Sequence, residues 1–169
     1  MSTVPVYVIP VSKAFYDSLP RTRLEAWLME LPIKARMLRF LATRSMSVAT
    51  TGFATSLALA FFNQAIAACN GEHSITVAWL HLDASRCAQR IGDLEPTENH
   101  LRAAIEIFCD LPPTHLAVLQ ASQDLVDVMT RRGRRAEALQ FIQHLLAETK
   151  VMVFPYPVAI ELKSLAQSL

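Results

Sequence analysis

The sequence predicts an all-α protein whose helical hairpins stack as a short solenoid or pack as an irregular helical bundle. Apolar residues recur at steps of three and four along most of the 169-residue chain, the spacing of helices with one buried face. Four glycines are present, and the nine prolines fall between the periodic segments. Because proline interrupts helices, these prolines mark helix ends. A chain of this length is long enough to form one domain, residues 1–169.

Two amphipathic helices are predicted in the first part of this domain, residues 20–71. The first, within RTRLEAWLMELP, stops at Pro32 and has four apolar residues at helical spacing: Leu24, Trp27, Leu28 and Leu31. The second, within IKARMLRFLATR, sets apolar residues against basic ones, and its apolar residues are Met37, Phe40 and Leu41. Each helix is therefore expected to bury one face.

Residues 45–71 carry no charged side chain, and the run is longer than the roughly 20 apolar residues that cross a membrane. Polar groups within it oppose a membrane span. Asn63 and Gln64 are adjacent, and each unpaired polar group costs about 1 kcal/mol or more in hydrocarbon. We therefore predict a central helix of a soluble bundle or solenoid, one that begins near Thr50 or Thr51 and is buried on all sides.

Residues 74–150 are expected to form two helical hairpins in tandem. In SITVAWLHLDASRCAQRIG, Ser74 is the predicted N-cap and Gly92 follows the helix end. The next helix is opened by Thr97 and closed by the DLPP stretch. THLAVLQASQDLVDVMTRRG and RRAEALQFIQHLLAETK then predict a helix, a turn at Gly133 and a second helix.

Two proline-bounded segments, Val4–Pro10 and Val151–Pro157, differ from the helical pattern. Their β-branched and aromatic residues predict short extended arms, one at residues 1–10 and one within residues 151–169. The arms either lie on the helical core or pair with each other or with a second subunit. A short helix is predicted to follow the second arm, over about residues 158–167.

The second hairpin, LQASQDLVDVMTRRGRRAEALQFIQHLLAETK, resembles a tetratricopeptide repeat. Aligned on the glycine of the turn, it matches the family's pattern of small and large residues at Leu125, Met129, Ala138 and Ile142. It departs where the family has tryptophan, glycine, a second small residue and proline, namely at Ser122, Val126, Leu145 and Lys150. Upstream, the family's spacing is kept by Trp79, Leu82, Ala104 and Phe108. The resemblance covers residues 76–150, in which the connection GDLEPTENH is several residues longer than in a standard repeat.

No catalytic group, metal site or cofactor is predicted. His144 and Glu148 lie four apart on one helix, but no third metal ligand is near them in sequence. His81, Asp83 and Cys87 are also close in sequence, yet on a helix Asp83 points about 200° away from His81. A nucleophile and its base must lie within hydrogen-bond reach, so these residues do not form a catalytic set. Scattered glycines build no phosphate-binding loop.

The cysteines favour a cytoplasmic protein. Cys69, Cys87 and Cys109 are odd in number and lack CxxC spacing, which argues against a disulfide framework. Charged residues interrupt residues 1–30, so no secretory signal is predicted there. The alanine- and arginine-rich composition is compatible with a bacterial source.

The tetratricopeptide resemblance implies non-catalytic recognition of a peptide or protein segment, as in adaptors and chaperones. The groove would be lined by the first helix of each hairpin, and its predicted residues are Trp79, Asp83, Arg86, Gln123 and Asp127. The basic turn TRRGRR adds candidate contacts to an acidic protein partner at Arg131, Arg132, Arg134 and Arg135.

Alternative functions belong to two other classes. The first is a homodimer or structural homo-oligomer of a bacterial assembly that uses the apolar arms. The second is an enzyme whose polar residues converge only in the folded chain. A deep pocket containing two or more of four residues would favour the enzyme: His73, His81, His100 and Glu106. A shallow, elongated, acidic groove would favour recognition.

The charge distribution argues against a nucleic-acid partner. The net charge is +1, and the middle of the chain, residues 72–130, contains three basic and nine acidic residues. Nucleic-acid-binding proteins gather positive charge on one face.

Overall fold

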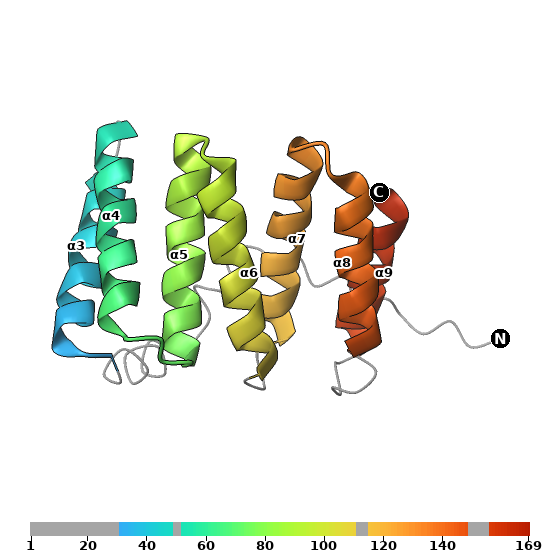
Figure 1. Ribbon diagram of the computed structural model, residues 1–169, viewed down its shortest axis with the longest axis horizontal. Coiled ribbons are helices and arrows are strands. Elements are labelled where there is room, and N and C mark those ends of the chain that lie inside the picture. Colours follow the sequence, from blue (N-terminus) through green and yellow to red (C-terminus); the bar gives the residue numbers. More distant parts are fainter. Residues whose placement is uncertain (1–30, 49–51, 111–114, 149–155) are drawn as a thin grey trace.

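The computed structural model describes residues 31–48, 52–110, 115–148 and 156–169. In chain order its helices are α3 (Ile33–Val48), α4 (Gly52–Ala68), α5 (Ile75–Ile91), α6 (Leu94–Asp110), α7 (His115–Arg131), α8 (Arg135–Glu148) and α9 (Tyr156–Ser168). The described residues contain no strand. Figure 1 shows the helices side by side, following one another along the long axis of the molecule. The predicted all-α fold is confirmed.

The described helices form three hairpins, α3/α4, α5/α6 and α7/α8, and α9 packs on α7 and α8. Neighbouring hairpins pack through the second helix of one and the first helix of the next, α4 on α5 and α6 on α7. The first helices begin at residues 33, 75 and 115, so the hairpins repeat after 42 and 40 residues. A tetratricopeptide repeat has a period of about 34 residues.

The predicted N-cap of α5 and the predicted glycines after α5 and α7 are confirmed. The Val77 backbone N–H donates to Ser74 Oγ at 3.4 Å, which satisfies one of the open donors of the first turn. Gly92 has φ of 86° and Gly133 has φ of 75°. These left-handed conformations suit glycine and end α5 and α7.

The predicted start of α6 at Thr97 is wrong, because the helix begins at Leu94. Pro96 therefore lies in the first turn, where a missing N–H costs no helical hydrogen bond. Thr97 Oγ1 donates to the Asp93 carbonyl at 2.6 Å instead of capping the helix. Only Gly92 and Asp93 separate α5 from α6, so the connection that looked too long is a tight turn.

The prediction that the helix of the uncharged run is buried on all sides is wrong, although its expected start near Thr50 or Thr51 lies next to the observed start of α4 at Gly52. The run is divided between the end of α3 at Val48 and α4, which begins at Gly52. One face of α4 is buried, through Thr55, Ala58, Phe62 and Ala65. Its other face is open, and Phe53 is 79% exposed. Within the described residues α4 packs mainly on α3 and α5, and these two contacts leave its other face open.

The residues that carried the tetratricopeptide resemblance lie in the core. The Ala138 position has no exposed surface, and the other buried residues of the set are Leu82, Ala104, Phe108, Leu125, Met129 and Ile142. The departure Ser122 is also buried. Cys69 and Cys87 are buried, Cys109 is half-buried, and none of the three forms a disulfide. Packing of these small and large residues where helices cross is general to helical hairpins.

Apolar side chains remain exposed on the hairpin at the α3 end of the described stack. They form what we call the end surface: Ile33, Met37, Phe40 and Leu41 of α3 with Phe53 and Leu57 of α4. No helix within the described residues is both long and apolar enough to cross a membrane.

The predicted helix within residues 21–30, the arm Val4–Pro10 and most of the arm Val151–Pro157 lie outside the described residues. The last part of the second arm is an exception, because α9 begins at Tyr156 rather than near residue 158. Pro157 is compatible with this early start, since proline is tolerated in the first turn of a helix.

Candidate functional site

Charged residues of the first helices meet on one side of the hairpins. Asp83 of α5 accepts a hydrogen bond from Arg86 Nη1 at 3.2 Å, one turn along the same helix. The other Asp83 oxygen lies 3.7 Å from Nη2 of Arg39, which belongs to α3. Burial raises the pKa of Asp83, and the two guanidinium groups oppose that rise. The side chains of Arg39, Asp83 and Arg86 are 18%, 24% and 37% exposed.

The same row continues onto α7 through Asp124. Gln120 Nε2 donates to Asp124 Oδ1 at 3.2 Å. Burial raises the pKa of Asp124, while the positive charge of nearby Arg86 lowers it. We call Arg39, Asp83, Arg86 and Asp124 the charged row, because it joins α3, α5 and α7, the first helices of three successive hairpins.

The other predicted groove residues lie elsewhere. Trp79 packs edge-on against Phe108 of α6, with ring centroids 5.2 Å apart, and so contributes to packing within its hairpin. Asp127 is exposed and pairs with Arg131, with Oδ2 and Nη2 2.8 Å apart. Gln123 is half-buried on α7. The structure therefore brings Asp83 and Arg86 together, whereas Trp79 contacts Phe108 and Asp127 pairs with Arg131.

Arg39 and Asp124 were missed by the sequence analysis. The sequence predicted that Arg39 lies on the polar side of an amphipathic helix that was not assigned to a hairpin. In the structure this helix, α3, is the first helix of the α3/α4 hairpin. Treating α3 as the start of a hairpin would have identified it. Asp124 lies one residue from the predicted Gln123, within the error of placing a helix face by sequence.

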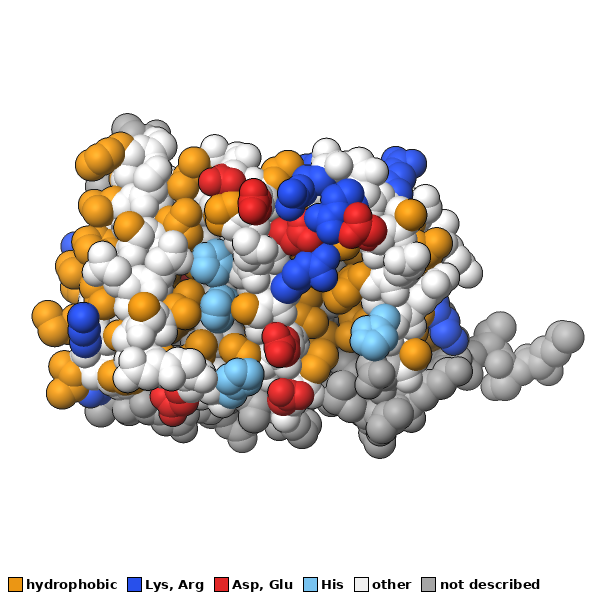
Figure 2. Space-filling model, in the orientation of Figure 1, with side chains coloured by type: hydrophobic (Ala, Val, Ile, Leu, Met, Phe, Trp, Pro, Cys, Tyr) orange, Lys and Arg blue, Asp and Glu red, His pale blue; other side chains and the backbone are white. Residues whose placement is uncertain are grey.

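A second charged group lies where α6 meets the turn between α7 and α8, and we call it the Glu98 cluster. Glu98 is 4% exposed, yet its carboxylate is contacted by three arginines. Arg102 donates from Nε and Nη2 at 3.0 and 2.9 Å, and Arg132 donates from Nη1 at 2.6 Å. Arg134 Nη1 lies 3.0 and 2.8 Å from the two carboxylate oxygens. Figure 2 shows basic and acidic side chains intermixed over this part of the molecule.

The electrostatics of this cluster keep Glu98 ionised. Burial raises the pKa of Glu98, but hydrogen bonds from Arg102 and Arg134 outweigh burial, and the net pKa lies below its usual range. Arg134 also binds the exposed Glu137 and lowers the pKa of that carboxyl. Arg132 and Arg134 of the predicted basic turn thus bind Glu98 of the preceding hairpin. Arg135 is exposed beside them.

A pair of histidines joins α5 to α6. His81 Nδ1 and His100 Nδ1 are 3.0 Å apart, so one ring donates a hydrogen bond and the other accepts it. Two protonated rings would repel each other at this distance. Burial and the neighbouring His100 lower the pKa of His81 to about 4, and burial also lowers the pKa of His100. Both rings are therefore neutral at pH 7.

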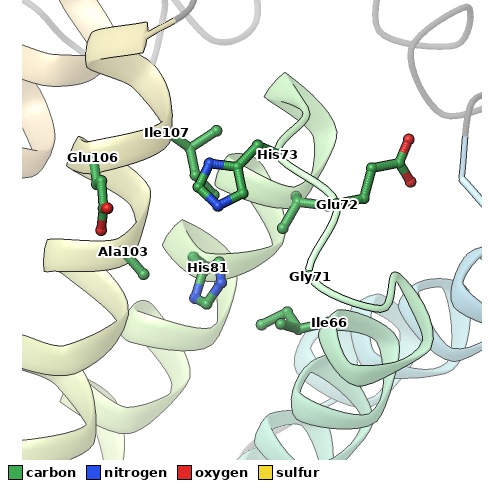
Figure 3. A pocket seen from close by; sticks show the side chains of 9 residues that line it. Ile66, Gly71, Glu72, His73, His81, Ala103, Glu106 and Ile107 are labelled. Carbon is green, nitrogen blue, oxygen red and sulfur yellow. The ribbon is translucent and has the colours of Figure 1, made fainter.

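A small pocket lies beside this pair. Figure 3 shows His73 and His81 facing it, with Glu106 of α6 on its side. Its volume of about 140 Å³ is below the roughly 300 to 1,000 Å³ of typical small-molecule sites. It contains three of the four residues that would favour an enzyme, but it is not deep. The described residues include no group of three or more His, Cys, Asp or Glu side chains that could hold a metal ion.

The three residues of the HLDASRC stretch face different neighbours. His81 contacts His100 and Asp83 contacts arginines, while the Cys87 Sγ lies 3.0 Å from the Met46 Sδ. Burial raises the pKa of the Cys87 thiol to about 12. A thiol with such a pKa remains protonated at pH 7 and is a poor nucleophile.

Comparisons with protein-family models, with curated proteins and with solved structures gave no match for this chain.

Proposed function

We propose that this protein is a non-catalytic recognition module that binds a peptide or protein segment across α3, α5 and α7, in the manner of an adaptor or chaperone. The observation that carries the proposal is the charged row, in which side chains from three successive hairpins approach one another. A surface built from several repeated hairpins is the usual way in which helical solenoids bind extended partners.

The chemistry of the row suits an extended polypeptide. Guanidinium groups donate several hydrogen bonds in a fixed plane, and carboxylates accept them. A peptide presents carbonyl oxygens and N–H groups at regular spacing, so it offers partners to both types of group. Asp83 holds Arg39 and Arg86 in place before binding, which reduces the entropy lost when a partner orders these side chains.

Partial burial strengthens each contact in the row. Charges with side-chain exposures of 18% to 37% interact in a medium of lower dielectric constant than bulk water. A partner that covers the row would strengthen these interactions further. By contrast, no activated nucleophile lines the small histidine pocket. Recognition explains why the polar residues of the charged row lie together, and catalysis does not.

Selection from a displayed library of random peptides tests this function. The purified chain is expected to enrich peptides that bind at micromolar Kd. The variant Arg86→Gln with Asp124→Asn removes one cation and one anion from the charged row. It should weaken binding of the selected peptides about tenfold or more, in line with the loss of charged hydrogen bonds.

The matched control is Lys163→Gln with Asp110→Asn, which removes one cation and one anion from exposed positions on α9 and α6. It should leave the Kd unchanged. Failure to enrich any peptide, or equal binding by the charged-row variant and the parent, would refute recognition by this face.

A further inference from the structure

The end surface exposes large apolar side chains on both helices of the α3/α4 hairpin. On α3, Met37 and Phe40 are 63% and 64% exposed, and on α4 Phe53 is 79% exposed. An aromatic side chain offers about 150 to 250 Å² of surface, so the two phenylalanines together expose about 200 Å² or more. With the remaining aliphatic side chains the surface reaches several hundred Å², the size of apolar patches that mark interaction sites. Figure 2 shows hydrophobic side chains at this end of the molecule.

An open hollow lies beside this surface, between the start of α3 and the end of α4. Its volume is about 470 Å³, and its lining residues are Lys34, Gln64, Ala67, Ala68 and Asn70. Phe53, Leu57 and Gln64 follow one another at steps of four and seven residues, so they lie on one exposed face of α4. The hollow therefore continues the end surface and adds an ammonium group and two amide groups to it.

The charge of this hairpin has one sign. Helix α3 contains Lys34, Arg36, Arg39 and Arg44, and neither α3 nor α4 contains an acidic residue. Arg39 faces Asp83 of α5, whereas Lys34 lines the hollow. Ten residues, or about 15 Å along the helix axis, separate Lys34 from Arg44. These two cations lie near the two ends of the apolar stripe, so an apolar partner flanked by negative charge complements the surface.

The same charge argues against a second copy of the chain as the occupant. A two-fold contact would place the end surface of one copy against that of the other. The basic side chains of the two α3 helices would then share one interface. Like charges across an interface oppose association.

The rest of the stack indicates that the occupant is a helix. The first helix of the second hairpin, α5, packs on α4, and the first helix of the third, α7, packs on α6. Helix α3 is likewise the first helix of a hairpin, and it is the first of the described helices. Apolar grooves of this kind accept amphipathic helices whose apolar residues recur at i, i+3, i+4 and i+7.

We propose that the end surface docks an amphipathic helix of a protein partner, with its apolar residues on Met37, Phe40 and Phe53 and an acidic side chain in the hollow beside Lys34. The partner helix needs about three turns to run from the hollow to Arg44, because one turn advances about 5.4 Å. Gln64 and Asn70 offer amide N–H groups to the carboxylate that enters the hollow.

This docking site is separate from the charged row. Met37 and Arg39 are two residues apart on α3, so their side chains point about 200° away from each other. Arg39 is directed at Asp83 of α5, and a helix on the end surface does not cover it. The two faces of the stack can therefore bind different segments at the same time.

A library of helix-forming peptides tests the docking. Each displayed peptide is about 15 residues long, has leucine at i, i+3, i+4 and i+7, and varies between glutamate, lysine and glutamine at the positions that flank this stripe. Selection uses the purified full chain. We expect glutamate to be enriched several-fold over lysine at the flanking positions, and the selected peptides to bind with Kd of about 10 to 100 μM.

Charge reversal tests the role of the hollow. Lys34→Glu should weaken binding of the selected glutamate peptides about tenfold and should strengthen binding of their lysine counterparts. A purely structural role of Lys34 would not produce this exchange of preference. Lys163→Glu, at an exposed position of α9, is the matched control and should leave both affinities unchanged.

A second pair of variants tests the apolar contact. Met37→Gln with Phe53→Gln removes two exposed apolar side chains and should weaken peptide binding about tenfold or more. The matched control is Ile91→Gln with Ile160→Gln, which changes two apolar residues that are 40% and 43% exposed on other helices. It should keep the parent's Kd.

Four outcomes would overturn the proposal. Equal enrichment of lysine and glutamate would remove the acidic partner. A dimer in light scattering that the Met37 and Phe53 variant loses would assign the surface to a second copy. Flotation with phosphatidylserine vesicles that the same variant loses would assign it to a lipid surface. No enrichment of any peptide by the folded monomer would mean that the chain itself covers the end surface.

Discussion

Helices α4 and α5 show that a more apolar sequence does not bury more residues. Helix α4 has no charged residue in its 17 positions, yet its buried residues are four, Thr55, Ala58, Phe62 and Ala65. Helix α5 also has 17 residues and contains His81, Asp83 and two arginines, yet nine of its residues are buried. Each helix packs on its two neighbours in the chain, α4 on α3 and α5, and α5 on α4 and α6. Helix α5 also contacts α3, through Asp83 with Arg39 and Cys87 with Met46.

Burial in this stack of hairpins therefore depends on how many helices surround a given helix, and not only on how apolar its sequence is. An apolar run alone does not show whether its helix lies at the centre or at the end. Polar residues on α5 are accommodated by partners on α6, as His81 has in His100, or on α5 itself, as Arg86 has in Asp83. Four experiments test this contrast between the centre and the end of the described stack.

The largest effect is expected from truncating matched phenylalanines in the two regions. Phe108→Ala removes a side chain that is 1% exposed and should lower the free energy of unfolding by about 3 to 5 kcal/mol. Phe53→Ala removes one that is 79% exposed and should change it by less than about 1 kcal/mol. Urea denaturation of both variants measures the difference. Similar losses for the two would show that the end surface is as well packed as the centre.

A small residue at a helix crossing gives the next effect. Ala138 has no exposed surface, so Ala138→Leu should overpack the α7/α8 hairpin and cost about 1 to 3 kcal/mol. Ala136→Leu, at an exposed position of the same helix, should be nearly neutral because leucine and alanine have similar helix propensities. Thermal melts that place both variants within a degree or two of the parent would mean that Ala138 does not lie at a crossing.

The Glu98 cluster should show a smaller loss. Glu98→Gln replaces charged hydrogen bonds by neutral ones and should cost about 1.5 kcal/mol in urea denaturation, near the low end for such bonds, because the arginines remain partly solvated. Glu106→Gln on the exposed face of α6 is the control and should be close to neutral. If the Glu98 variant matches this control, the cluster does not hold the two hairpins together.

The histidine pair should make the centre sensitive to mild acid. The folded pKa of His81 is about 4, below the ordinary value of 6.5, so the unfolded chain binds more protons between these values. The contribution of His81 to stability is therefore complete above about pH 6.5 and is lost as the pH falls towards 4. The melting temperature should fall between pH 7 and pH 5, and less steeply for His81→Gln. His144→Gln, at an exposed position of α8, should retain the parent's slope.

Local sequence chemistry predicted the hairpins because the relevant interactions are local. Ser74 caps α5 within one turn, and Gly92 and Gly133 adopt left-handed conformations that few other residues take. The start of α6 was misplaced for a reason of the same kind. The predicted start was Thr97, although Pro96 in the first turn of a helix leaves every helical hydrogen bond intact.

The candidate site was predicted only in part because it depends on contacts between hairpins. Asp83 and Arg86 lie one turn apart on one helix, so their pairing could be read from spacing. Arg39 is 44 residues away from Asp83 in sequence, and nothing in the sequence sets the rotation of α3 relative to α5. The basic turn was predicted to bind a partner because its contact with the preceding hairpin could not be read from the sequence. In the structure Arg132 and Arg134 bind Glu98 of that hairpin.

The serial order of the hairpins also bears on how the chain acquires its fold. The main contacts between described helices join neighbours in sequence, apart from the contact between α7 and α9. Such local contacts close short loops, so we expect rapid folding. Among the described helices, α3 and α4 are synthesised before α5, and α6 is synthesised after it. Each new hairpin can therefore add to a surface already formed by the one before it, and the ribosome need not release the whole chain before folding begins.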